Sequence, residues 1–340
     1  MRISFVDLSV LGPDDSRAQA LEDTLTSVAH AERIGAMRYW FTEHHATSGF
    51  ASTAPAVLIA AASRVTSTIR LGSGAVLLNQ HSPYLVAETF ATLEQLAPGR
   101  IDLGLGRATA GRIVDLALQR GRRATESVNF GEQVAEIVAF GRDGFAAGHP
   151  FAQIDRPAPA VARPELWVLG SSGATAGIAA DLGLGYVMAA FINPDGAAPA
   201  LERYRSGFSP TTSGFRSPHS AVSVNVVVAE TDSDARRIAW SHKAGLAMLQ
   251  AGVGSRRMPT IDEAQSILTD GQKDSPTTIA DGRWPTVIAG STRTVAAQLG
   301  LIRDITGATE IVAQDQIPEL STRLRSHELL AEAAAQLRGL

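Results

Sequence analysis

The sequence predicts an α/β fold, namely a (β/α)8 TIM barrel with an insertion near strands 7 and 8. Three observations lead to this prediction. Short apolar runs alternate with amphipathic helical stretches, eight runs of strand type can be counted, and the 340 residues suffice for a barrel with one insertion. Because no linker divides the chain, we expect residues 1–340 to form a single domain. A doubly wound sheet with a second domain remains the main alternative.

The predicted strands are short apolar runs, several of them rich in β-branched residues, and most are bounded by turn residues. They cover residues 3–8, 38–42, 69–77, 100–105, 165–169, 185–190, 221–229 and 310–313. Between them, apolar residues recur at helical spacing, as Leu21, Leu25 and Val28 do, and Pro55 suits a first helical turn. Later helices are predicted at 113–119, 127–140, 174–182, 196–206, 234–249, 294–302 and 319–337.

Residues 251–286 do not show this alternation of predicted strands and helices. They contain clusters of Gly, Pro, Ser, Thr and Asp with one predicted helix at 261–268, which indicates an irregular insertion. We expect this insertion to act as a mobile lid over the site.

The composition excludes several classes of protein. A net charge of -4 without a basic cluster predicts no nucleic-acid partner and no binding to an anionic membrane surface. The absence of cysteine excludes disulfide scaffolds, thiolate zinc sites and a cysteine nucleophile. The first residues lack the features of a signal peptide, and no apolar run approaches the ~20 residues of a membrane span. We therefore expect a cytoplasmic location.

Lysine and histidine positions narrow the chemistry further. A Schiff-base lysine would project from the end of a strand, whereas Lys243 lies in a predicted helix and Lys273 in a polar loop. His44, His45 and His81 are the histidines near strand ends, and neighbours on an extended chain point in opposite directions. We therefore predict neither an imine mechanism nor a metal site.

In a barrel of this kind, the loops after the strands build the active site. Residues 170–175, Gly-Ser-Ser-Gly-Ala-Thr, join a strand to a helix start, where free amides suit an anion. Arg107 ends the neighbouring strand and can pair with the same anion. The alternatives are helix capping by Ser172 or Thr175 and a rim salt bridge of Arg107.

Two further segments are candidates. After the second strand, Glu43-His44-His45 offers a general acid or base. The alternative is a histidine whose hydrogen bonds are made within its own loop. The sequence Gly-Ser-Gly-Ala at 72–75 interrupts the third strand, which indicates either close approach of a ligand or a bulge that helps the barrel curve. Charged residues elsewhere on or near the strands are interpreted as structural; they are Asp7, Glu88, Arg100 and Asp102.

Three motifs together resemble the bacterial luciferase-like family of flavin-dependent monooxygenases. They are FTEHH, then IRLGSGAVLLNQHSPYLVAETFATLEQLAPGRIDLGLGRA, then LGSSGATAGIAADLGLG. The likeness covers residues 1 to about 210 and returns at TVIAGSTRTVAAQLG. Each motif alone is weak evidence for the family, but the order and spacing of the three together are specific to it. The resemblance implies a barrel, usually dimeric, that binds reduced FMN with its phosphate between the ends of strands 4 and 5.

The resemblance also implies roles for individual residues. Arg107, Ser172 and Thr175 would hold the phosphate, and His44 matches the histidine that assists proton transfer around a flavin C4a-hydroperoxide. The loop that shapes the phosphate site would consist of Gly170, Ser171 and Gly173. A cis peptide bond beneath the flavin ring would map to Ser73-Gly74 or Gly74-Ala75.

There are also departures from the family pattern. Gly106 stands where luciferase has a reactive cysteine, and Ser171 replaces an acidic residue. The insertion at 251–286 matches no family pattern.

We therefore expect a monooxygenase that uses reduced FMN and O2 to oxygenate a small organic substrate. The FMN would be a dissociable co-substrate supplied by a separate flavin reductase, since no dinucleotide site is found. The small-residue helix at 54–63 suits either a homodimer contact or burial within one chain. The alternatives are a deazaflavin-dependent oxidoreductase on the same barrel and a non-catalytic flavin-binding subunit.

Overall fold

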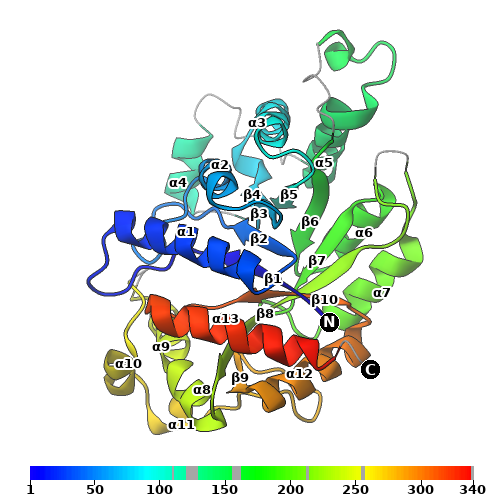
Figure 1. Cartoon of the computed structure of the whole chain (residues 1–340). Helices are drawn as coiled ribbons and strands as arrows, with labels where there is room; N and C mark the ends of the chain where they lie inside the picture. Colours follow the sequence, from blue (N-terminus) through cyan, green and yellow to red (C-terminus); the bar gives the residue numbers. More distant parts are fainter. Residues whose placement is uncertain (109–110, 120–128, 155–161, 212–213, 254–256, 338–340) are drawn as a thin grey trace.

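The strands of the computed structural model form a closed parallel barrel (Figure 1). The structure describes residues 1–340 except 109–110, 120–128, 155–161, 212–213, 254–256 and 338–340. The strands are β1 (Arg2–Asp7), β2 (Arg38–Phe41), β3 (Arg70–Ser73), β4 (Val76–Leu77), β5 (Ile101–Gly106), β6 (Glu165–Gly170), β7 (Gly185–Ala189), β8 (Ser220–Ala229), β9 (Ile288–Ser291) and β10 (Glu310–Gln314).

Strand pairing closes the barrel. The hydrogen-bonded order is β10-β1-β2-β3-β5-β6-β7-β8, and β8 pairs with β10 in turn. Every one of these pairs is parallel, with Phe5 opposite Ala313 and Ile311 opposite Val222. Because β3 and β4 both pair with β5, they share one position, and the barrel has the eight positions of a TIM barrel. The predicted fold is confirmed, and the doubly wound sheet is excluded because the pairing of β8 with β10 closes the barrel.

Helices surround the barrel on the outside (Figure 1). They are α1 (Arg17–Arg33), α2 (Pro55–Val65), α3 (Pro83–Leu96), α4 (Arg112–Leu118), α5 (Phe130–Val138), α6 (Gly173–Asp181), α7 (Ala197–Gly207), α8 (Asp232–Ile238), α9 (Trp240–Gln250), α10 (Ile261–Ile267), α11 (Asp270–Lys273), α12 (Thr292–Thr306) and α13 (Leu320–Ala335). Pro55 occupies the first turn of α2, and Gly307 closes α12 in the left-handed conformation, both as helix-end chemistry favours.

The structure differs from the predicted elements in four places. The predicted strand at 69–77 is broken into β3 and β4, and the predicted helix at 234–249 is divided into α8 and α9. The insertion holds a second short helix, α11, after the predicted one. The additional strand β9 pairs with the outer half of β8, where Val226 lies opposite Ile288. β9 has only four residues, Ile-Ala-Gly-Ser, directly before α12, and so short a run has too little periodicity to be recognised as a strand.

Charged side chains connect five strands near their N-terminal ends. Arg38 of β2 donates hydrogen bonds to Asp102 of β5 at 2.9 Å and to Glu310 of β10 at 3.0 Å. It also reaches Glu165 of β6 at 2.9 Å, and Arg70 of β3 pairs with Asp102 at 2.6 Å. Asp102 is fully buried. This network supports the structural interpretation of Asp102 and leaves the opposite end of the barrel for the site.

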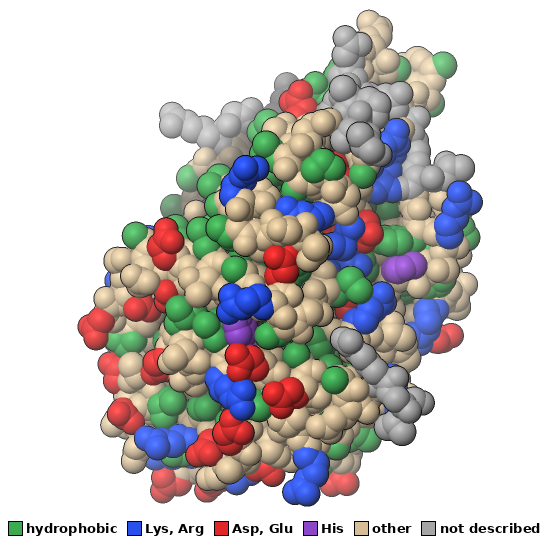
Figure 2. All heavy atoms as spheres, viewed as in Figure 1, with side chains coloured by type: hydrophobic (Ala, Val, Ile, Leu, Met, Phe, Trp, Pro, Cys, Tyr) green, Lys and Arg blue, Asp and Glu red, His purple; other side chains and the backbone are tan. Residues whose placement is uncertain are grey.

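The surface has mixed charge. Figure 2 shows basic and acidic side chains interspersed over the face that it presents. None of the helices that the structure describes is long and apolar enough to cross a membrane.

Candidate functional site

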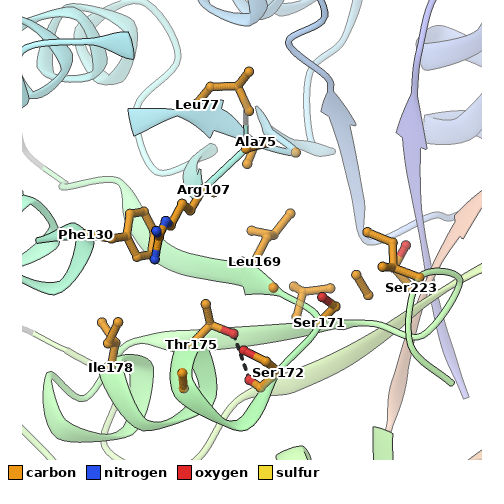
Figure 3. Close-up of a pocket in the computed structure, with 18 of the residues that line it drawn as sticks. Ala75, Leu77, Arg107, Phe130, Leu169, Ser171, Ser172, Thr175, Ile178 and Ser223 are labelled. Carbon is orange, nitrogen blue, oxygen red and sulfur yellow. Dashed lines mark hydrogen bonds between the residues drawn. The ribbon is translucent and has the colours of Figure 1, made fainter. Parts of the chain in front are cut away.

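A cavity of about 980 Å³ opens at the C-terminal ends of the strands. Its inner wall is made of side chains that point inward from the strands, and its outer wall comes from α5, α6 and the loops after β5, β6 and β7. Figure 3 shows Arg107 and Phe130 on one side and Ser223 on the other. Cavities of this size hold cofactor-sized ligands.

The loop between β6 and α6 forms one end of the cavity. Ser172 is the N-cap of α6, and its side chain makes no capping bond. Thr175 Oγ1 instead donates to the Ser172 carbonyl at 2.8 Å, as the dashed line in Figure 3 marks. Asn193 Nδ2 donates to the Ser171 carbonyl at 2.9 Å. The carbonyls are therefore occupied within the protein, while the hydroxyls of Ser171 and Ser172 line the cavity at a helix N-terminus.

Gly170 permits this loop to close tightly. A Cβ atom at Gly170 would lie 2.3 Å from Thr175 Oγ1, so a side chain there would displace Thr175. Arg107 follows β5 directly, is exposed, and lines the same end of the cavity. A cation, two hydroxyls and a helix N-terminus thus converge on one place, which is the donor set of a phosphate site.

The break between β3 and β4 lies beside this site. The peptide bond Gly74-Ala75 is cis, which confirms one of the two expected positions, and both residues line the cavity. Gly106 of β5 faces them, since a Cβ atom on Gly106 would lie 2.9 Å from the Cβ of Ala75. Ser73 is fully buried and its hydroxyl is bonded to the backbone of Gly104.

Ser73 and Gly173 are therefore the two predicted cofactor-binding residues that do not line the cavity. The other predicted cofactor residues do; they are Gly74, Ala75, Arg107, Gly170, Ser171, Ser172 and Thr175.

His44 lies in an adjoining cavity of about 350 Å³. The two cavities share Gly74, Phe191 and Gln314 in their walls, so they meet at the cis peptide bond. His44 Nδ1 lies 2.9 Å from Thr42 Oγ1, and its ring packs against Phe50 with centroids 5.0 Å apart. Burial, with a smaller effect from neighbouring His45, lowers the pKa of His44 to about 4. The imidazole is therefore neutral at physiological pH and able to accept a proton.

The adjacent residues of the motif belong to a separate cluster. Glu43 is buried, and its Oε1 lies 2.7 Å from Nε2 of both His45 and His81. Its Oε2 accepts the backbone N–H of Leu77 at 2.9 Å. Burial alone would raise the pKa of Glu43, but these hydrogen bonds hold it below its ordinary value. His45 thus fixes the loop rather than sharing a ligand with His44, and the described residues contain no cluster suited to a metal ion.

Comparison with known proteins is consistent with this geometry. A model of the luciferase-like monooxygenase family matches residues 1–309. The chain belongs to the luciferase-like monooxygenase family.

Two relatives match nearly the whole chain. A protein of Escherichia coli described as a luciferase-like monooxygenase is 33% identical, with 99% of this chain and 98% of the relative covered. The solved structure of apo-MsnO8 is 35% identical over 98% of each chain, with a TM-score of 0.86.

Two structures of lower identity show the fold alone. One is the oxygenating constituent of 3,6-diketocamphane monooxygenase of Pseudomonas putida in complex with FMN, with 19% identity, 99% of this chain and 98% of the other covered, and a TM-score of 0.69. The other is a coenzyme F420-dependent reductase of Methanopyrus kandleri, with 15% identity, 99% of each chain covered and a TM-score of 0.68.

The structure adds residues to the candidate site that the sequence motifs did not indicate. Phe130 of α5 and Ile178 of α6 give the phosphate end an apolar side. Ser223 of β8 and Gln314 of β10 line the opposite end of the cavity. Ser223 and Asn225 are polar residues within a run that is otherwise mostly valine and alanine, and such interruptions are a signal that sequence inspection could have used. No comparable pattern marks Phe130 or Ile178.

Proposed function

We propose that this protein is a flavin-dependent monooxygenase that takes reduced FMN and O2 and oxygenates a small organic substrate. The observation that carries the proposal is the joined pair of cavities. One has the donor set of a phosphate site at its end, the other contains His44, and they meet at the cis peptide bond Gly74-Ala75.

The residues present fit an FMN molecule. Arg107, the hydroxyls of Ser171 and Ser172 and the first amides of α6 would hold the phosphate. The cavity also has apolar walls, contributed by Val6, Trp40, Leu169, Val187 and Val312, which suit an aromatic ring system. When bound, the flavin would supply the oxygen chemistry, through the C4a-hydroperoxide that the family resemblance implies.

The protein's own contribution is to orient groups, exclude water and move a proton. His44 occupies the second cavity beside the junction, with Nδ1 fixed by Thr42, which leaves Nε2 for a proton transfer. Apolar side chains from the loop after β1, from α9 and from the insertion form much of the remaining wall. They are Leu8, Leu246, Leu249 and Met258. The substrate would bind here, shielded from solvent.

Anaerobic titration of the purified protein with reduced FMN, followed by admission of air, tests the proposal. We expect saturable binding and then a long-lived absorbing species that free reduced FMN does not give. Failure to bind reduced FMN would contradict the proposed function, and the same titration with reduced coenzyme F420 would then examine the deazaflavin alternative. Coenzyme F420 is an appropriate second ligand because an F420-dependent reductase has the same barrel.

His44 separates an enzyme from a non-catalytic flavin-binding subunit. In the proposed enzyme, His44→Ala sharply reduces oxygenation while FMN affinity changes little, because His44 lies outside the phosphate cavity. A non-catalytic subunit would show no oxygenation in the wild type either, and His44→Ala would leave its FMN affinity and stability unchanged.

We propose further that the protein forms a homodimer through α2 and α3. Val57 of α2 is 67% exposed, and Leu85 and Leu96 of α3 are 57% and 51% exposed, although α2 and α3 pack side by side. Burying such an apolar face in a second copy would remove it from water. Light scattering on the eluted protein should give twice the mass of one chain, and a monomer at micromolar concentration would remove this part of the proposal.

The separate flavin reductase and the cytoplasmic location remain parts of the proposal. So does the lid, which is supported by the fact that two residues of the insertion, Arg257 and Met258, line the second cavity. Equal proteolysis of residues 251–286 with and without FMN would count against it.

A further inference from the structure

The second cavity, where the substrate is proposed to bind, has a wall with a positive charge. Among the described residues that line it, the ionisable side chains are His44, His242 and Arg257, and none is an aspartate or a glutamate. Burial is the main cause that lowers the pKa of both histidines to about 4, so their rings are neutral at physiological pH. Arg257 therefore carries the charge of this wall.

Arg257 is exposed, but backbone carbonyl groups fix it in place. Its Nη1 donates hydrogen bonds to the carbonyl oxygens of Gly12 and Pro13, each at 3.1 Å, and also to that of Asp15. All three carbonyls belong to the loop after β1. Because these bonds already restrict the long side chain, a ligand that binds it loses less affinity to the ordering of a flexible arginine.

The charge of Arg257 is not neutralised by a carboxylate in the part of the chain that the structure describes. The side chain of Asp15 is engaged elsewhere, since its Oδ2 accepts the backbone N–H of Gly12 at 2.7 Å. A guanidinium has five N–H donors, and the three on Nη2 and Nε make no hydrogen bond with a described residue. Arg257 therefore keeps both donors and charge for an incoming anionic group.

Much of the remaining wall is apolar. It includes Leu8, Phe50, Phe191, Leu246, Met248, Leu249 and Met258. A cationic ligand would bring a second positive charge into this cavity without an acid to pair with it, which is unfavourable where water is excluded. A ligand with an apolar body and one anionic group would instead pair with the guanidinium and bury its body against these side chains.

We propose that Arg257 is a specificity-determining residue that pairs with an anionic group, such as a carboxylate, on an otherwise apolar substrate. This site is distinct from the phosphate end of the first cavity, because Arg107 lines only the first cavity and Arg257 only the second. The inference rests on the proposed function in calling the ligand a substrate, but binding of the ligand can be measured without flavin.

Three probes of similar shape and different charge test this inference. Heptanoate, heptanamide and heptylamine are anionic, neutral and cationic at neutral pH, and all are small enough for a cavity of about 350 Å³. Isothermal titration calorimetry of the flavin-free wild-type protein gives their dissociation constants. We expect heptanoate to bind roughly 10-fold more tightly than heptanamide, the lower end of what a charged pair provides because Arg257 is exposed. Heptylamine should bind more weakly than either.

Arg257→Gln and Arg257→Lys separate the charge of the side chain from its shape. We expect Arg257→Gln to lose the preference for heptanoate while heptanamide binds as before, which also shows that the cavity is intact. Arg257→Lys should keep a weaker preference, because an ammonium keeps the charge but cannot form two parallel hydrogen bonds. Arg107→Ala is the matched control and should leave heptanoate binding unchanged, because Arg107 lines the other cavity.

Equal affinity of the wild-type protein for the three probes, or no binding of heptanoate, would overturn the inference. So would an unchanged preference for heptanoate in Arg257→Gln, or its loss in Arg107→Ala. If Arg257→Gln binds neither heptanoate nor heptanamide, equal binding of the two by Arg257→Lys would contradict the inference. Titration with reduced FMN is a separate measurement: failure there with the heptanoate preference intact would contradict the proposed function and leave the anion site standing.

Discussion

At the scale of single residues, Arg107 is the side chain on which the phosphate site depends most. It is the cation that lines the phosphate end of the cavity among the residues that the structure describes. Hydrogen bonds between charged partners are worth about 1.5–3 kcal/mol, which corresponds to roughly 10- to 150-fold in affinity.

Arg107→Ala should therefore weaken FMN binding by roughly 10-fold or more and leave riboflavin binding unchanged, because riboflavin has no phosphate. Fluorescence titration of both ligands measures this difference. Arg293→Ala, which removes an exposed arginine of α12 outside the cavity, serves as the control. An equal loss for FMN and riboflavin would place Arg107 elsewhere than at the phosphate.

His44 makes stability depend on pH. Its folded-state pKa of about 4 lies below the ordinary value of 6.5 because burial disfavours the charged ring. Between these two values the unfolded chain binds a proton that the folded chain does not, so stability falls as the pH drops through this window. At pH 5 the loss is on the order of 2 kcal/mol.

Urea unfolding at pH 7 and pH 5 should therefore show a smaller loss for His44→Gln than for the wild type. His242, whose pKa burial also lowers to about 4, is present in both proteins and cancels in the comparison. The same pH dependence in both proteins would show that His44 is not protected from protonation.

The sequence predicted most of these residues and the grouping of the phosphate residues, but not that Ser73 lies outside the cavity. Arg107, Ser171, Ser172 and Thr175 line one cavity as expected, since loops after neighbouring parallel strands meet at one end of a barrel. Ser73 lies in the right strand but points into the packing between β3 and β5. Whether a residue of this strand lines the cavity or packs between the strands depends on where the strand breaks. The two-residue period of a strand cannot specify the position of that break.

At the scale of elements, the backbones of β3 and β5 approach each other closely. Gly104 of β5 lies directly against β3, and a Cβ atom there would lie 2.0 Å from the carbonyl oxygen of Ser73. Both atoms belong to strand backbones, so neither can move without shifting its strand.

Gly104→Ala should destabilise the protein by about 1–3 kcal/mol or more, as overpacking of a core does. The free energy of urea unfolding is the measurement. Gly271→Ala on α11 is the control, because nothing lies within 4 Å of its added Cβ atom. If Gly104→Ala were as stable as the wild type, the approach of the two strands would be looser than described.

Strand β8 shows why one element escaped prediction. The apolar run was expected to be a single barrel strand, and its first half does pair with β7 and β10. Its second half extends beyond them and pairs with β9. A long β-branched run predicts a strand but not where its neighbours end, because pairing partners are distant in sequence.

At the scale of the whole molecule, the charged network near the N-terminal ends of the strands joins five strands around the barrel. Asp102 accepts hydrogen bonds from Arg38, Arg70 and the indole N–H of Trp40. Removing a buried carboxylate leaves its cations uncompensated, which costs about 3–5 kcal/mol.

Asp102→Ala should accordingly lower the free energy of unfolding by about 3–5 kcal/mol, measured by urea denaturation. Asp262→Ala, which removes a carboxylate that is 86% exposed in its pair with Arg237, should change it little. Similar effects of both substitutions would mean that the network is an ordinary surface feature.

The pairing of β1 with β10 has a consequence for synthesis of the chain. Arg2 lies opposite Glu310, so β1 finds one of its two neighbours only after β10, the last strand of the barrel, has been synthesised. Until then β1 has an unpaired edge, and the incomplete sheet cannot close. The barrel therefore completes its folding only after all of its strands have been synthesised, and in that interval its apolar inner surface is open to aggregation.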